Sequence, residues 1–237
     1  MKTSIAALVV VALAAGSAQA ERTFTVKNSC EKTIWPALFT SVGTAPGQKT
    51  GWEAKAGSSV SFQVDDTWNG RIWARTDCDF SSGSTLPSTC LTGGCNGGLV
   101  CATVGGTGVA PASLAEWNLN ASEDWLDVSL VDGFNLPISI TNDVGCDEPT
   151  CTADLNTNCP AELSVSNSAG DVVGCNTACG ANLDGTPANS KNCCSGEYDT
   201  PEKCPSSGVQ VYDEASGSAL FTCPHDKSAN YVVTFCP

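Results

Sequence analysis

Fifteen cysteines constrain this chain more than any other feature of its sequence. All of them follow residue 29, after a start that is typical of a secretory signal peptide. Met1–Ala20 contains a charged Lys2, an apolar run over residues 5–15 and the small-x-small sequence Ala18-Gln19-Ala20. Because the secretory route is oxidising, we expect the cysteines to form disulfides. Their odd number leaves at least one without a partner in the chain.

The composition argues against a metal-binding, a nucleic-acid-binding or a membrane-spanning protein. His225 is the only histidine, and the cysteine spacings vary where a cysteine-only zinc site needs close pairs. The formal net charge of −14 becomes −15 once Lys2 leaves with the signal peptide, and such a polyanion is repelled by phosphates. No segment is apolar for long enough to span a bilayer. We expect a monomer that is secreted, extracellular or in a cell wall, with no metal or other cofactor.

Alternation of polar and apolar residues predicts a mainly β fold. Turn residues separate the β-rich runs at intervals of roughly ten residues, which is typical of a sandwich or barrel. Only residues 150–159 could hold a short helix. The runs are Thr23–Lys27, Ser59–Val64, Ile72–Arg75, Trp125–Leu130, Leu136–Ile140 and Asn230–Phe235.

The second half of the chain has a different character. Eight cysteines lie between Cys146 and Cys204 among many Asn, Ser, Gly and Asp residues, so cross-links must replace a large apolar core there. We expect a β core from residues 21–140 plus the last strand, and a disulfide-rich lobe at about 141–222. Asn120 begins an Asn-Ala-Ser sequon and is a predicted N-glycosylation site.

Carboxylates are the groups best suited to carry chemistry in this sequence. A serine hydrolase requires a histidine base, and the chain has only His225 and no Gly-x-Ser-x-Gly elbow. The glycine-rich residues 105–108 are not followed by a basic residue, which favours a plain loop over a phosphate cradle. Glycoside hydrolysis needs only a pair of carboxyl groups, one of them with a raised pKa.

Six ordered segments resemble the thaumatin-like protein family, and together they cover essentially the whole mature chain. The wording Thr92-Gly93-Gly94-Cys95 looks like the fungal branch of this family. The resemblance implies a thaumatin-like β-sandwich, a disulfide-rich second lobe and an acidic cleft between the two. The segments are Gly70–Phe80, Cys90–Cys101, Ser113–Trp117, Asp127–Pro137, Cys159–Leu163 and Tyr231–Pro237.

The resemblance also implies disulfide pairs. They are Cys30–Cys236, Cys78–Cys90, Cys95–Cys101, Cys146–Cys223, Cys159–Cys175, Cys179–Cys193 and Cys194–Cys204. Family members usually have one more cysteine, in a stretch after Val209 that is missing here. Cys151 is therefore expected to be unpaired, or to take Cys204 and leave Cys194 free. A shortened gene model is an alternative explanation of the missing stretch.

Four residues match the acidic cleft of the family: Arg71, Glu116, Asp127 and Asp132. A fifth, acidic member falls in the missing stretch. In an enzyme, Glu116 is the expected proton donor, Asp132 the nucleophile or base, Asp127 a tuning group and Arg71 an electrostatic anchor. Structural roles stay open from the residues alone, because Asp132-Gly133 is a common turn and Asp127 lies in an alternating strand.

The resemblance predicts a protein that binds and hydrolyses β-1,3-glucan of fungal cell walls. The alternative is a non-catalytic glucan-binding or antifungal defence module. Sugar rings stack on aromatic faces, so the six tryptophans are candidate contacts. Trp73 lies in an alternating strand and is expected in the core, whereas Trp52 and Trp68 lie in likely loops and are expected to be exposed.

Overall fold

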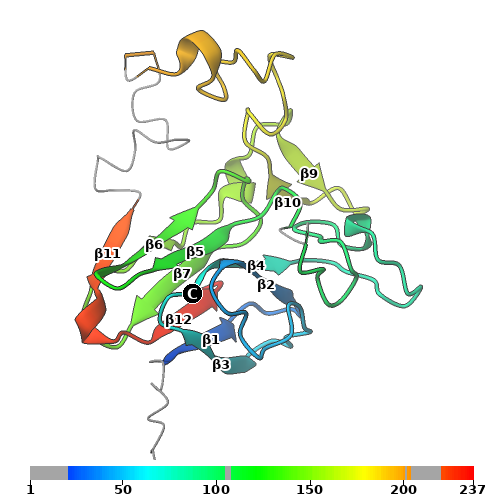
Figure 1. The fold of residues 1–237 in the computed structure, drawn as a ribbon. Helices are drawn as coiled ribbons and strands as arrows, with labels where there is room; N and C mark the ends of the chain where they lie inside the picture. Colours follow the sequence, from blue (N-terminus) through cyan, green and yellow to red (C-terminus); the bar gives the residue numbers. More distant parts are fainter. Residues whose placement is uncertain (1–20, 105–107, 201, 204–219) are drawn as a thin grey trace, which may run out of the picture.

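A computed structural model describes residues 21–104, 108–200, 202–203 and 220–237. Two five-stranded sheets dominate it, which confirms the mainly β fold (Figure 1). The signal peptide, Cys204 and the stretch after Val209 lie outside these residues. Within them, no helix has the length and apolar character needed to cross a membrane.

The first sheet has the strand order β3-β1-β12-β7-β8. Its central strand is β12, the last strand of the sequence, which pairs in parallel with β1 and antiparallel with β7. The long sequence separation of β1 and β12 makes this pairing invisible to local patterns. The strands are β1 (Glu21–Asn28), β3 (Ser59–Asp65), β12 (Tyr231–Phe235), β7 (Ile138–Asn142) and β8 (Thr150–Cys151).

The second sheet is antiparallel throughout, in the order β11-β6-β5-β4-β2. Alternation in β4 and β6 predicted these two strands, whereas β2, β5 and β11 went unpredicted. The strands are β11 (Phe221–Pro224), β6 (Glu123–Ser129), β5 (Leu114–Leu119), β4 (Asn69–Arg75) and β2 (Trp35–Val42).

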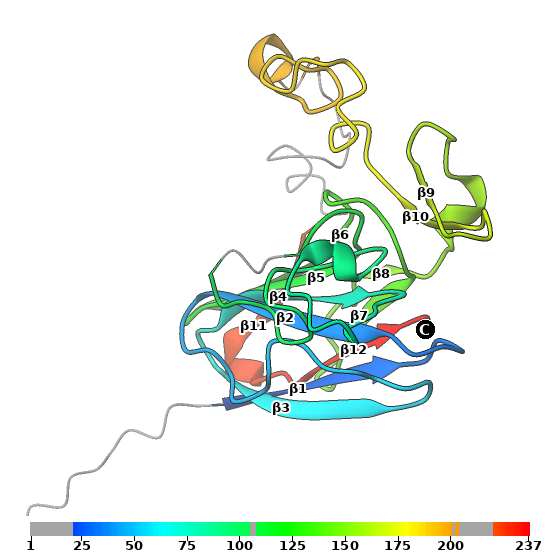
Figure 2. The same cartoon turned by 90° about the vertical axis from the view of Figure 1, so that its right-hand side faces the viewer.

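The core lies between these two sheets, which are stacked in Figure 2. Successive side chains of a strand point to opposite faces, so each strand gives every second residue to the core. In β5, Ala115, Trp117 and Leu119 are buried in this way, and Glu116 and Asn118 point to the other face. The outward face of the second sheet carries a smaller cluster around Trp73 and Leu114 at one end.

The segment after β7 contributes to the core sheets as well as to a separate lobe. β8 extends the first sheet and β11 extends the second, although both fall in the expected lobe. The lobe contains the hairpin β9 (Ser164–Ser166) and β10 (Val172–Cys175), which lies beside the sandwich and is joined to it by an isolated β-bridge between Phe134 and Cys175 (Figure 1 and Figure 2). A 3-10 turn, η2 (Leu155–Asn158), occupies part of the expected helix region. Further 3-10 turns are η1 (Pro87–Thr89), η3 (Gly196–Tyr198) and η5 (His225–Lys227).

Six disulfides are present in the described part of the chain. Cys151 is free and half-buried, and burial raises the pKa of its thiol. Cys194 is disulfide-bonded, which matches the first of the two alternatives for Cys151. The six pairs are Cys30–Cys236, Cys78–Cys90, Cys95–Cys101, Cys146–Cys223, Cys159–Cys175 and Cys179–Cys193.

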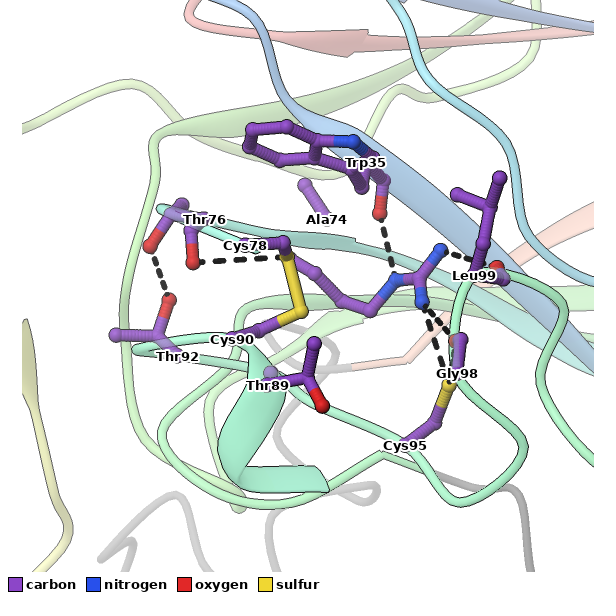
Figure 3. Close-up of a disulfide and its surroundings, with 12 residues drawn as sticks. Trp35, Ala74, Thr76, Cys78, Thr89, Cys90, Thr92, Cys95, Gly98 and Leu99 are labelled. Carbon is purple, nitrogen blue, oxygen red and sulfur yellow. Dashed lines mark hydrogen bonds between the residues drawn. A yellow bond between two sulfur atoms is a disulfide. The ribbon is translucent and has the colours of Figure 1, made fainter. Parts of the chain in front are cut away.

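Arg75, at the end of β4, fixes the loop around one of these disulfides to the second sheet. Figure 3 shows Cys95, Gly98 and Leu99 of this loop beside Trp35 of β2. The buried guanidinium donates hydrogen bonds of 2.9, 2.9 and 2.8 Å to the carbonyl oxygens of Trp35, Gly98 and Leu99. Burial lowers the pKa of Arg75 to about 10. Backbone carbonyls thus take the place of a carboxylate partner for this charge.

A second buried group of polar side chains ties the two sheets together at the opposite end. We call Arg22, Asp124 and Tyr231 the buried charge cluster, and the partly exposed His225 lies beside it. Arg22 and Asp124 are 1% and 0% exposed, with Nη2 and Oδ1 3.6 Å apart. The hydroxyl of Tyr231 donates a 2.8 Å hydrogen bond to Asp124, and burial beside this carboxylate raises the pKa of Tyr231. The Nη2 of Arg22 also donates to the carbonyl oxygen of His225 at 2.9 Å.

Candidate functional site

Three of the four predicted site residues form a row across the second sheet. Strand register places Arg71 of β4 opposite Glu116 of β5, and Glu116 opposite Asp127 of β6. Directly paired residues point to the same face of a sheet. Because Ala115 and Trp117 are buried in the core, the row lies on the outward face. The sheet therefore brings together residues that are far apart in the sequence.

Arg71 connects this row to the fourth predicted residue. Its Nε lies 3.1 Å from Oε1 of Glu116, and its Nη1 lies 3.6 Å from Oδ2 of Asp132. The three side chains are 31%, 27% and 42% exposed, so they face solvent without being fully hydrated. One guanidinium thus holds two carboxyl groups that come from a strand and from a loop. Asp127 also has an interaction partner.

Asp132 lies in the turn that its sequence allowed, and its side chain reaches another predicted site residue. It lies in a turn after β6, closed by a 2.9 Å hydrogen bond from the amide of Gly133 to the carbonyl of Leu130, and its side chain reaches Arg71. Gly133 has φ of 85°, and a Cβ there would lie 2.5 Å from the carbonyl oxygen of Cys175. Glycine is therefore required where the turn packs against the lobe.

The environment of Glu116 perturbs the ionisation of its carboxyl group. Burial raises its pKa above the ordinary glutamate value, and the nearby charge of Asp132 adds to the rise. The positive charge of Arg71 and a hydrogen bond from Ser129 act in the opposite direction. A carboxyl with a raised pKa beside a second carboxylate is the arrangement that general acid catalysis uses.

In the described residues, no three His, Cys, Asp or Glu side chains are grouped so that they could hold a metal ion. Hollows of about 440 and 430 Å³ lie elsewhere, the first between β3 and residues 44–48, the second between Asp77 and Ser168. Neither is lined by the four site residues, so the acidic cleft stays a prediction.

The prediction that Trp52 and Trp68 are exposed is wrong. Trp68 is 0% exposed, and its Nε1 donates a 2.8 Å hydrogen bond to Oγ1 of Thr40. Trp52 is 9% exposed and packs edge-on against Phe62. Loop composition misled here because Trp52 lies in a segment bridged to β2, and Trp68 lies in the turn directly before β4, so both rings reach the core. Trp73 is 0% exposed, as expected.

Phe39 and Trp125 flank the charged row on the outward face. Phe39 of β2 is opposite Arg71, and Trp125 lies two residues before Asp127 in β6. Both are partly exposed. Trp125 was among the predicted sugar contacts, whereas Phe39 was not. The only sequence signal for Phe39 was its place in a strand. The apolar run Pro36-Ala37-Leu38 obscures the alternation of that strand.

Asn120 lies in the short turn between β5 and β6. Its Oδ1 accepts hydrogen bonds from the amides of Ser122 and Glu123 at 3.0 and 3.1 Å. The turn joins the two strands that carry Glu116 and Asp127. Glycosylation of Asn120 stays a prediction.

Comparison with known proteins gives a consistent result over most of the chain. The model of the Thaumatin family matches residues 28–237. Pathogenesis-related thaumatin-like protein 3.5 of Cryptomeria japonica is 40% identical over 237 residues, which cover 94% of this chain and 93% of that protein. A Prunus avium protein named glucan endo-1,3-beta-glucosidase is 38% identical over 259 residues, which cover 100% of both chains. The assignment to a fungal branch stays a prediction.

A solved structure gives the same result for the fold. The thaumatin-like xylanase inhibitor TLXI superposes with a TM-score of 0.50 at 21% identity, over 90% of this chain and 99% of that one. At this identity the likeness concerns the fold alone.

Proposed function

Because the chain belongs to the thaumatin family, we propose that it is a secreted protein that binds β-1,3-glucan of fungal cell walls and hydrolyses it. The observation that carries this proposal is the pairing of Glu116, whose pKa is raised, with Asp132 through Arg71. A relative of matching length is named a glucan endo-1,3-beta-glucosidase. Proteins of this family are generally secreted, and six disulfides fit an oxidising compartment.

In the proposed reaction, Glu116 donates a proton to the oxygen of the bond that breaks. Asp132, with the charge of Arg71 beside it, is the nucleophile or the base that activates water. Arg71 holds both carboxyl groups in place, and Asp127 adds negative charge next to Glu116. Phe39 and Trp125 offer apolar ring faces on which sugar units can stack.

The test is release of reducing ends from a purified β-1,3-glucan at mildly acidic pH. We expect release by the wild type, a loss of about 100-fold or more in Glu116→Gln, and no change in Glu53→Gln, which alters an exposed glutamate in the same way. Unchanged activity in Glu116→Gln would remove this residue from the mechanism.

Retention on insoluble glucan, measured on the same proteins, separates catalysis from binding. Retention without any sugar release supports the non-catalytic glucan-binding module instead. A protein that neither releases sugar nor is retained refutes both functions. One relative is named a pathogenesis-related protein, which makes a defence role the alternative to hydrolysis. For this reason the test measures binding as well.

A further inference from the structure

The outward face of the second sheet carries another row of side chains beside the charged row. Strand register places Asn69 of β4 opposite Asn118 of β5, and Asn118 opposite Trp125 of β6. Trp125 is in turn opposite Thr222 of β11. We call these four residues the amide row. The first three are each two residues along their strands from a member of the charged row, so the two rows share a face and lie about 6.8 Å apart.

The sheet face is closed on the other side of the charged row. The next row there is buried, with Trp73, Leu114 and Ser129 only 0%, 2% and 8% exposed. The disulfide Cys95–Cys101 packs against this end of the sheet, in the smaller cluster around Trp73. A ligand that lies over Glu116 and follows the strands can therefore extend in one direction, over the amide row.

The polar groups of the amide row are available to such a ligand. Asn118 is exposed, and the other three side chains are half-buried. The Oδ1 of Asn69 accepts a 2.8 Å hydrogen bond from the hydroxyl of Ser41, which holds this amide and leaves its Nδ2 hydrogens to donate. Within the residues that the structure describes, the side chains of Asn118, Trp125 and Thr222 have no hydrogen-bond partner. Amides both donate and accept, and an indole adds an apolar ring face.

We propose that the amide row is a sugar subsite, which binds the glucan unit next to the one that lies over Glu116. The ring of Trp125 meets the C–H face of this unit, and the amides of Asn69 and Asn118 bind its hydroxyl groups. The subsite rests on the glucan binding proposed above and does not require that a bond is cut. It fixes the direction in which the glucan leaves the charged row, away from the turn of Asp132.

The experiment is a titration with a β-1,3-linked glucose hexamer, in Glu116→Gln protein so that the ligand stays intact. We expect Asn118→Leu, which keeps the approximate size of the side chain, to weaken binding of the hexamer by about 2–10-fold. Gln63→Leu is the matched control, because it removes an exposed strand amide from the first sheet, and it should leave the affinity unchanged.

NMR of the ¹⁵N-labelled Glu116→Gln protein gives a second readout that leaves the amide row intact. The side-chain amide signals of Asn69 and Asn118 should shift as the hexamer is added, and the signal of Gln63 should not. A hexamer that binds Asn118→Leu with unchanged affinity, or that leaves the Asn118 amide signal unshifted, overturns the subsite, whereas the proposed glucan binding stands. A hexamer that binds neither Glu116→Gln nor the wild type refutes the glucan binding, and the subsite with it.

Discussion

Removing the charge of Asp124 should unfold this protein more readily than any surface substitution. The Asp124→Asn change keeps the size of the side chain but leaves Arg22 without its carboxylate. The two charges lie 3.6 Å apart, and at an effective dielectric constant of about 20 their attraction is about 5 kcal/mol. Breaking a buried pair by removing one partner costs about 3–5 kcal/mol. Arg22 keeps its 2.9 Å hydrogen bond to the carbonyl of His225, so we expect a loss within this range.

Tyr231→Phe measures a smaller part of the same cluster. It removes one hydrogen bond to a charged acceptor, and we expect a loss of about 1.5–3 kcal/mol. Asp226→Asn is the matched control, because Asp226 is exposed and one residue from His225. It should change the free energy of unfolding by less than about 0.5 kcal/mol.

The assay is unfolding in guanidinium chloride with the disulfides intact, followed by tryptophan fluorescence. Free energies are compared only among variants that share one denaturant slope. Because both charges are buried, the loss in Asp124→Asn should be nearly the same at low and high salt. A loss no larger than that of Asp226→Asn would refute the reasoning, since it would mean that the buried ion pair contributes nothing net.

Three further predictions concern other parts of the molecule. Alkylation of Cys151 in the native protein should be slow at neutral pH and become faster as the pH rises, because burial raises the pKa of its thiol. Mass mapping measures the rate, and labelling as fast as in the unfolded protein would contradict the prediction. Gly51→Ala should destabilise by about 1–3 kcal/mol, because a Cβ there would lie 2.1 Å from the carbonyl oxygen of Leu99; an unchanged unfolding midpoint would mean that this loop yields. The folded-state pKa of Glu116 is raised, so the wild type should lose stability relative to Glu116→Gln as the pH rises through that pKa. A difference in the free energy of unfolding between the two proteins that stays constant from about pH 3 to about pH 8 would rule this out.

Three of the strands that the sequence predicted have two faces that differ. β1, β3 and β6 alternate because one face meets the core and the other meets solvent. β2 alternates poorly, because Pro36 and Ala37 are buried on opposite faces, one of them beneath the smaller cluster around Trp73. A strand that is covered on both sides loses the period that identifies it.

Parts of the candidate site depend on contacts that no local pattern contains. The pairing of Glu116 with Asp127 follows from a short hairpin and is within reach of sequence reasoning. The approach of Arg71 to Asp132 depends on how the turn after β6 folds back beside β4. Here the family resemblance supplied the grouping, and the structure supplies the two distances.

The place of β12 in the middle of its sheet has a consequence for how the protein is made. Cys30 and Cys236, which flank β1 and β12, are 206 residues apart, so at usual rates of translation β1 is complete about 10–40 s before its neighbour exists. During that time β1 and β7 each lack the strand that separates them, and Phe24 of β1 lacks its ring contact with Tyr231. Cys78–Cys90 and Cys95–Cys101 can close early, whereas Cys30 must stay reduced until the last strand arrives. Any bond that Cys30 forms with an earlier cysteine has to be broken by thiol–disulfide exchange before Cys30–Cys236 can close.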